Sequence, residues 1–194
     1  ADNVVREALD LFGRVDSLVN SAGIAKNVPL MELDLKTWND LFALHVTGTL
    51  LCSQSVARVL VKQNEGGTIV NLSSMAASMA MYATGAYASA KAAVSALTRA
   101  FAVELAQFGI RVNAVAPGPV ATEQLLKAYG PAGYADRGHS IPLNRLADPE
   151  EVAGAIEFLL SDDSKYLTGV VLPLDGGASA VGAYSYDTYK RNAS

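Results

Sequence analysis

Short apolar segments alternate with long segments of helical spacing along the chain, and this alternation limits the fold more than any other feature. The clearest strand, residues 68–72, is β-branched and apolar on both faces, as a parallel strand covered by two layers must be. Successive parallel strands are joined by right-handed helical crossovers. The sequence therefore predicts an α/β fold in which a doubly wound parallel sheet carries helices on both faces.

The boundaries of the elements follow from glycines, prolines and capping residues. Strands are predicted at 15–19, 68–72, 110–116 and 170–174, and helices at 4–12, 35–63, 85–108 and 149–160. Asp148 before Pro149, with Glu151 at the third helical position, is a typical helix start. The segment 125–146 holds several glycines and a proline, which predicts a mobile flap. Without a repeat or linker, residues 1–194 are expected to form a single domain.

The composition excludes several classes of partner. The formal net charge is −4 and the basic residues are scattered, so we expect neither nucleic acid nor a membrane surface as a partner. No uninterrupted apolar run reaches the ~20 residues needed to span a bilayer. Cys52 is the only cysteine, which excludes an internal disulfide and favours a reducing, cytoplasmic location. We expect no metal site.

Tyr87 and Lys91 are four residues apart on the predicted helix 85–108, so their side chains share one face. A phenol titrates near ~10, which is too high for efficient proton exchange at neutral pH, and a nearby ammonium lowers that pKa. Tyr87 could then donate a proton to a developing alkoxide or remove one from an alcohol. Because such pairs also arise by chance on many helices, the spacing alone predicts little.

Three groups of polar or turn-forming residues follow predicted strands: residues 20–23, Ser74 and residues 117–122. In open parallel sheets, ligands bind beyond the carboxyl ends of the strands. Ser74 could donate a hydrogen bond to a carbonyl oxygen that Tyr87 also holds, which would stabilise developing charge; the alternative is a capping serine. Thr122 could hold a polar cofactor group, although its segment could simply terminate the strand.

Together these motifs resemble those of the short-chain dehydrogenase/reductase family. The match runs in the same order over nearly the whole chain: Asn20-Ser21-Ala22-Gly23, Ser74, Tyr87-x-x-x-Lys91, 113–118 with Thr122, and Leu174-Asp175-Gly176-Gly177. The resemblance implies a Rossmann-like fold and an enzyme that transfers a hydride between NAD or NADP and a secondary alcohol or ketone. It implies that Tyr87 is the acid/base, that Ser74 polarises the substrate carbonyl, and that Lys91 lowers the pKa of Tyr87 and binds the nicotinamide ribose.

The resemblance also implies a cofactor site and an assembly. The cofactor-lining residues would be Asn20, Ala22 and Gly23 on the adenosine side, Tyr87 and Lys91 at the ribose, and Pro117, Gly118, Val120 and Thr122 at the nicotinamide carboxamide. The sequence does not separate NAD from NADP. A homotetramer is implied, formed through helices 35–63 and 85–108 and the last strand. The apolar faces of these helices are wide enough for a partner, although one face could simply rest on the sheet.

Two departures from the family pattern have consequences. His45 stands where the family usually has an asparagine, whose backbone carbonyl completes a proton relay through water to the lysine. Because a carbonyl survives any substitution, the relay could persist, with the imidazole either joining it or merely filling space. Ser21 replaces a second asparagine, which is a milder change.

The second departure lies at the N-terminus. The family's glycine-rich turn, with the strand before it and the helix that faces the pyrophosphate, is not in this sequence. We therefore expect the chain to be the C-terminal three-quarters of a complete member, with the N-terminal strands missing and strand 15–19 left as an unpaired edge. If Ala1 were the native start, cofactor affinity should be weak.

The substrate and the role of the tail stay open. Around the expected pocket lie Met75, Met79, Met81, Tyr82, Tyr134 and His139, which would suit a sugar, a polyol or a 3-oxoacyl thioester. The leading hypothesis is a carbonyl reductase or alcohol dehydrogenase. The alternative is a non-catalytic binding or scaffold protein that keeps the fold; an epimerase or dehydratase would need a larger substrate domain. The tail 178–194 could reach a neighbouring subunit or close the pocket.

Overall fold

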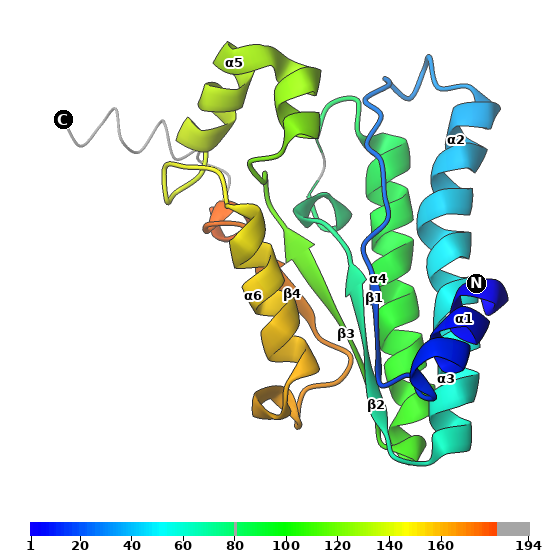
Figure 1. Ribbon diagram of the computed structural model, residues 1–194. Coiled ribbons are helices and arrows are strands. Elements are labelled where there is room, and N and C mark those ends of the chain that lie inside the picture. The colour runs from blue at the N-terminus through cyan, green and yellow to red at the C-terminus, as the bar shows by residue number, and fades with distance from the viewer. Residues whose placement is uncertain (80, 182–194) are drawn as a thin grey trace.

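Four parallel strands form the central layer of the computed structural model, which describes residues 1–79 and 81–181 (Figure 1). The strands are β1 (Ser17–Asn20), β2 (Gly67–Leu72), β3 (Ile110–Pro117) and β4 (Val171–Leu174), and they lie in the order β1-β2-β3-β4. Val19 lies opposite Val70, and Val115 lies opposite Leu172. The predicted strand boundaries agree with these to within two residues.

Helices cover both faces of this sheet (Figure 1). They are α1 (Asp2–Phe12), α2 (Leu35–Phe42), α3 (Gly48–Gln63), α4 (Gly85–Leu105), α5 (Glu123–His139) and α6 (Pro149–Leu160). Successive strand residues point to opposite faces. Ile69 accordingly shares a core with Leu60 of α3, whereas Val70 and Val115 pack with Leu159 of α6. The predicted doubly wound, Rossmann-like arrangement is thereby confirmed.

The predicted helix 35–63 consists of three consecutive segments: α2, a π-helical turn at Ala43–Thr47, and α3. It begins where the Asp34 carboxylate accepts a hydrogen bond from the backbone N–H of Thr37 at 2.7 Å. Within the described part of the chain, this is the helix long and apolar enough to cross a membrane by length and composition. In the structure it packs on β1 and β2 and buries Val56 and Leu60, as a core helix does.

The segment 125–146, which the sequence predicts to be a mobile flap, is helical over most of its length. α5 begins where the Thr122 hydroxyl oxygen accepts a hydrogen bond from the backbone N–H of Leu125 at 3.2 Å. Gly130 interrupts it with φ 64° and ψ 174°, a conformation that favours glycine. Pro131 then opens the second half, where a missing N–H costs no helical hydrogen bond. Gly130 and Pro131, which suggested a flap in the sequence, mark a kink between the two helical halves of α5.

Short 3₁₀ turns that the sequence did not predict lie at Met75–Ala77, Ala106–Phe108, Asp162–Ser164 and Ala178–Ala180. The first of these follows β2 directly and positions Ser74. The tail alternatives fall on residues 182–194, which lie outside the described residues.

Candidate active site

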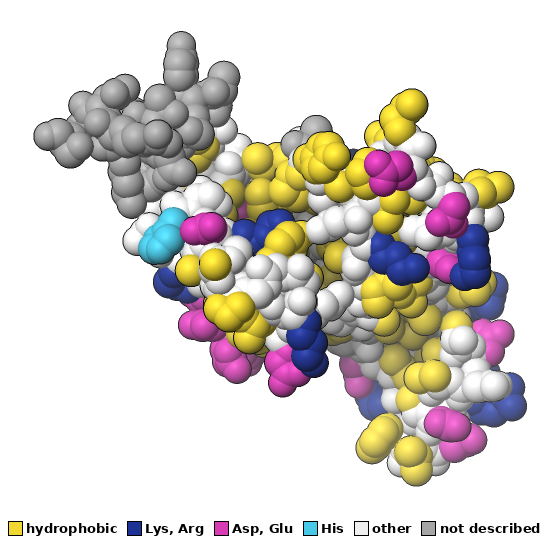
Figure 2. Space-filling model, turned by 90° about the horizontal axis from the view of Figure 1, so that it is seen from above, with side chains coloured by type: hydrophobic (Ala, Val, Ile, Leu, Met, Phe, Trp, Pro, Cys, Tyr) yellow, Lys and Arg dark blue, Asp and Glu magenta, His cyan; other side chains and the backbone are white. Residues whose placement is uncertain are grey.

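The carboxyl ends of the strands meet at one edge of the sheet, at the top of Figure 1. Asn20 ends β1, Ser74 follows β2, and Gly118 follows β3. The backbone N–H of Gly118 donates a hydrogen bond to the carbonyl oxygen of Leu174 at 2.9 Å, so the pairing of β3 with β4 continues past the strand ends. Seen from this end, apolar side chains are exposed beside Lys and Arg side chains over the middle of the face (Figure 2).

Ser74 and Tyr87 are brought together by the turn that joins β2 to α4. The backbone of Ser74 is extended, and its hydroxyl oxygen accepts a hydrogen bond from the backbone N–H of Ala76 at 3.2 Å. The same side chain lies beside Tyr87, close enough to lower the pKa of its phenol. The two interpretations of Ser74 are therefore compatible, because the hydroxyl both caps the turn and contacts the phenol.

Lys91 lies one helical turn after Tyr87 and is buried. Its Nζ donates a hydrogen bond to the carbonyl oxygen of Leu72 at 2.7 Å and lies 5.8 Å from the centroid of the Tyr87 ring. Burial lowers the pKa of Lys91 to about 8, because a low-dielectric environment disfavours the ammonium. An ammonium carries three donors, so the bond to Leu72 leaves donors for a ligand.

The pKa of Tyr87 differs from the expectation. Burial raises this pKa, and the hydrogen bond from Ser74 opposes the rise without cancelling it. Lys91 was expected to lower the pKa of Tyr87, but its charge is not among the causes of the shift, in which burial prevails. The Tyr87 hydroxyl therefore holds its proton at neutral pH.

His45 lies in the π-helical turn, facing Tyr87. The His45 side chain is buried at 2 % exposure, and its ring stands edge-on to the Tyr87 ring with 5.5 Å between centroids and 80° between planes. Its Nε2 is hydrogen-bonded to the carbonyl oxygen of Ile24 at 2.8 Å, whereas its buried Nδ1 has no partner among the described residues. Burial, followed by the charge of Lys91, lowers the pKa of His45.

A ladder of hydrogen-bonded polar side chains, which the sequence did not predict, connects β1 and β2 to α4. Asn20 Nδ2 donates to the side-chain oxygens of Asn71 at 2.8 Å and of Ser53 at 3.1 Å. Asn71 Nδ2 in turn donates to the Thr98 hydroxyl at 2.9 Å. The sequence feature that could have indicated this ladder is Asn71, a polar residue within the strand 68–72 that was predicted to be buried on both faces. The ladder fixes the position of α4, and with it Tyr87, relative to β1 and β2.

The predicted cofactor residues lie at the same edge of the sheet. Ala22 and Gly23 are exposed in the loop after β1. Gly118 must be small, because a Cβ there would lie 2.9 Å from the Asp175 Cα. Val120 forms an isolated bridge with Ala147. The hydroxyl oxygen of Thr122 caps α5, which leaves its O–H free to donate.

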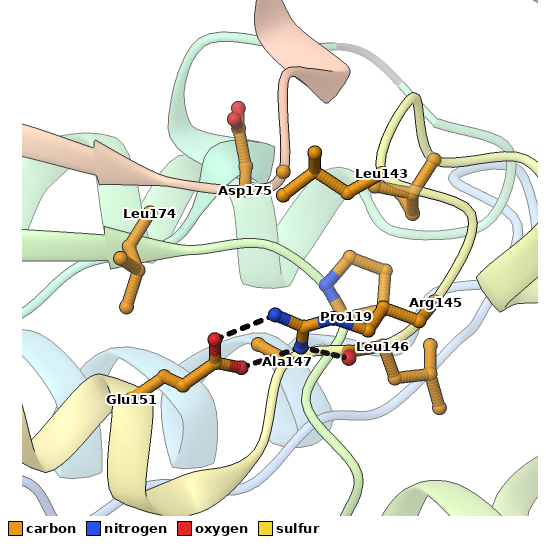
Figure 3. A pocket seen from close by; sticks show the side chains of 10 residues that line it. Pro119, Leu143, Arg145, Leu146, Ala147, Glu151, Leu174 and Asp175 are labelled. Carbon is orange, nitrogen blue, oxygen red and sulfur yellow. Dashed lines mark hydrogen bonds and ion pairs between the residues drawn. The ribbon is translucent and has the colours of Figure 1, made fainter.

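Two cavities lie near this edge. One of about 80 Å³ is lined by the ion pair Arg145–Glu151, whose closest atoms are 2.6 Å apart, and by Leu174 and Asp175 (Figure 3). The other, of about 320 Å³, lies beside Ser74 and Asp175. Ser74, from the predicted catalytic group, thus lines the larger of these two cavities.

Comparison with known proteins agrees with this geometry. Residues 1–179 match the family model described as "Enoyl-(Acyl carrier protein) reductase". A 3-oxoacyl-[acyl-carrier-protein] reductase from Synechocystis sp. is 40% identical over 179 residues, which cover 91% of this chain and 70% of the relative. Acetoin dehydrogenase from Enterobacter cloacae superposes with a TM-score of 0.84 at 35% identity, covering 94% of this chain and 71% of that one.

A further solved structure, of ElxO with NADP bound, has a TM-score of 0.87 at 33% identity and covers 93% of this chain and 73% of that one. The similarity therefore extends over nearly the whole chain. From the family model and from relatives at this level of identity, the chain belongs to the short-chain dehydrogenase/reductase family of oxidoreductases.

Proposed function

We propose that this site transfers a hydride reversibly between NAD(H) or NADP(H) and a secondary alcohol or ketone, with Tyr87 as the general acid/base. The observation that carries the proposal is that Ser74 and the buried ammonium of Lys91 both lie beside Tyr87, with Lys91 Nζ 5.8 Å from the centroid of its ring. All three groups lie where the strands of the sheet end, which is where ligands bind in this type of fold. Membership of an oxidoreductase family supports the same type of reaction.

The donors at the site fit a dinucleotide. Lys91 and Tyr87 present an ammonium and a hydroxyl beside each other, which suits the hydroxyls of a nicotinamide ribose. We propose that the remaining lining residues are Asn20, Ala22 and Gly23 toward the adenosine, and Pro117, Gly118, Val120 and Thr122 toward the nicotinamide. A bound nicotinamide supplies or accepts the hydride. Either NAD or NADP meets these requirements, and NADP is the cofactor present in the ElxO structure.

Tyr87 and Ser74 act on the substrate oxygen in this proposal. In ketone reduction the Tyr87 hydroxyl donates a proton to that oxygen, and Ser74 donates a hydrogen bond to it as negative charge develops. Because its raised pKa keeps Tyr87 protonated at neutral pH, reduction is favoured there. Alcohol oxidation needs the phenolate, so we expect its rate to rise with pH.

We propose a substrate of small or medium size with both apolar and hydroxyl-bearing parts, such as a sugar, a polyol or a 3-oxoacyl thioester. Two of the similar proteins act, by their names, on a 3-oxoacyl thioester and on acetoin, and both compounds carry a ketone. We also propose that residues 1–194 form a single domain, that the protein assembles as a homotetramer and that it is cytoplasmic. Sedimentation velocity, which gives the mass of the assembly, tests the tetramer.

The reaction is tested by mixing the protein with NADH or NADPH and a panel of ketones and following the loss of reduced-nicotinamide absorbance. Turnover that Tyr87→Phe abolishes supports the proposal. Turnover that survives in Tyr87→Phe would remove Tyr87 from the mechanism. If a confirmed full-length protein neither binds a nicotinamide nucleotide nor turns over any ketone, the non-catalytic scaffold is the better description.

A further inference from the structure

The histidine at position 45 connects two parts of the site that are separate in sequence. Its ring stands edge-on to Tyr87 of α4, and its Nε2 lies 2.8 Å from the carbonyl oxygen of Ile24 in the loop after β1. A Cβ on Gly23 would lie 2.6 Å from His45 Cε1, which is closer than packed atoms approach. One buried ring thus separates this loop from the catalytic tyrosine and touches both.

The hydrogen-bond partners identify the form of the imidazole. A carbonyl oxygen accepts hydrogen bonds and cannot donate them, so Nε2 of His45 must carry the hydrogen that points at Ile24. The neutral ring then has a bare lone pair on Nδ1, and no donor among the described residues faces it. A proton on Nδ1 would be buried without an acceptor.

We infer that His45 is a positioning residue whose neutral imidazole, with hydrogen on Nε2, holds the Ile24 backbone and the Tyr87 ring together, and that protonation disturbs this packing because the added Nδ1–H is buried without an acceptor. The inference rests on the proposed function, because it concerns the placement of the proposed acid/base. It assigns a role to the imidazole itself, in addition to that of the His45 backbone carbonyl.

Two effects oppose protonation of this ring. Burial of a donor without an acceptor costs free energy, and the ammonium of Lys91 on α4 repels a second positive charge. The hydrogen bond to the Ile24 carbonyl favours the protonated ring but does not outweigh these two effects. Lys91 and Tyr87 face the ring from α4, and the Ile24 carbonyl faces it from the loop after β1. Since the pKa of His45 lies below the ordinary ~6.5, the neutral arrangement persists below that pH and is lost as the pH falls through the lowered pKa.

Two variants separate the hydrogen bond from the shape of the ring. His45→Asn keeps an N–H donor for Ile24 and does not titrate, so we expect a several-fold loss of kcat at pH 8 but no histidine-dependent decline at acidic pH. His45→Phe keeps a ring against Tyr87 without the donor, so we expect about a tenfold or greater loss of kcat/KM at every pH. Equal acid declines in the wild type and in His45→Asn would overturn the inference.

Gly23→Ala tests the contact with the loop. In the wild-type background the added methyl meets the His45 ring, and kcat/KM should fall about tenfold or more; in the His45→Asn background the fall should be under about threefold. Equal losses in the two backgrounds would overturn the proposed contact. Thermal unfolding of all four proteins shows whether they are folded at the assay temperature.

Imidazole ¹⁵N spectra provide a readout that needs no turnover. The chain has two histidines, and His139→Gln assigns the second set of signals. The expected result is a neutral His45 with hydrogen on Nε2 at pH 7, titrating below the ordinary ~6.5 of a histidine. A His45 with hydrogen on Nδ1, or one already charged at pH 7, would overturn the inference even in an active enzyme. If no ketone is reduced, the proposed function fails, while these spectra still decide the state of His45.

Discussion

Lys91 Nζ donates a hydrogen bond to the backbone carbonyl oxygen of Leu72 at 2.7 Å, and this bond ties the face of α4 that carries Tyr87 to the end of β2. Ser73 reinforces the junction, because its hydroxyl is hydrogen-bonded to the Ser95 hydroxyl at 2.7 Å. The lysine is therefore positioned by the sheet rather than by Tyr87. Its charge lies beside the phenol because both side chains project from one face of a helix that the sheet holds in place.

Replacement of Lys91 by methionine should stabilise the fold while abolishing activity. Because the folded state lowers the pKa of Lys91 from its ordinary value to about 8, the buried ammonium costs free energy at neutral pH. After allowing for the lost bond to Leu72, Lys91→Met should raise the free energy of unfolding by about 2 kcal/mol at pH 7. Urea titrations measure this change.

The same substitution makes a prediction about pH. Between pH ~8 and ~10 the unfolded chain still binds the Lys91 proton that the folded chain has released, so stability should rise with pH in the wild type. Lys91→Met should lack that rise. A wild-type stability that falls steadily over this interval would contradict the burial of a charged lysine.

Loss of the Tyr87 hydroxyl should act on the chemistry rather than on the fold. Tyr87→Phe should lower kcat by about 10²–10⁴-fold, the usual contribution of positioned acid–base catalysis. Tyr166→Phe removes a hydroxyl from a fully exposed side chain and serves as the matched control. A comparable loss in both variants would point to a general effect and away from proton transfer.

The Thr98 hydroxyl should be needed to position α4. Thr98→Val keeps the shape of the side chain but leaves Asn71 Nδ2 without the acceptor it has at 2.9 Å. An unsatisfied buried donor costs about 1–3 kcal/mol, so the free energy of unfolding should fall by that amount. Thr98→Ser keeps the hydroxyl and should stay near the wild type. Chemical denaturation of the two variants in parallel decides the matter.

Arg111 of β3 should stabilise the packing of the C-terminal end of α6 on the sheet. Its guanidinium donates hydrogen bonds to the carbonyl oxygens of Leu159 at 2.9 Å and Ser161 at 3.0 Å, which a helix end leaves without intrahelical partners. Arg111→Met should destabilise the fold by about 2–4 kcal/mol in urea unfolding. Arg111→Lys keeps the charge but not the planar fork of donors, and should recover only part of the loss. Full recovery would show that charge alone suffices.

The sequence predicted the strands well because a strand buried on both faces has few alternatives to β-branched residues, as in residues 68–72. Ser74, Tyr87 and Lys91 were found because their order along the chain matches a family pattern, and the structure places them together. The pKa of Tyr87 could not be predicted in this way, because burial depends on how α4 packs. The polar ladder through Asn71 and Thr98 could not be predicted either. It depends on contacts between a strand and a helix, and the spacing of residues along one element does not reveal such contacts.

The contact between Asn27 and Tyr129 should hold α5 over the carboxyl ends of the strands. The Asn27 side-chain amide donates a hydrogen bond to the Tyr129 hydroxyl, and the Arg137 guanidinium lies 3.7 Å from the centroid of the same ring. The ring therefore connects the loop after β1 to both halves of the kinked helix. Tyr129→Phe removes the bond to Asn27 and keeps the surface under Arg137.

We expect amide hydrogen exchange in residues 123–139 to become about tenfold faster in Tyr129→Phe, because one hydrogen bond fewer opposes local opening. Exchange in β2 and β3 should not change, which provides an internal control. Tyr129→Leu, which also removes the ring beneath Arg137, should accelerate exchange further. If exchange in both variants equals that of the wild type, the kinked helix is held by its packing and not by this contact.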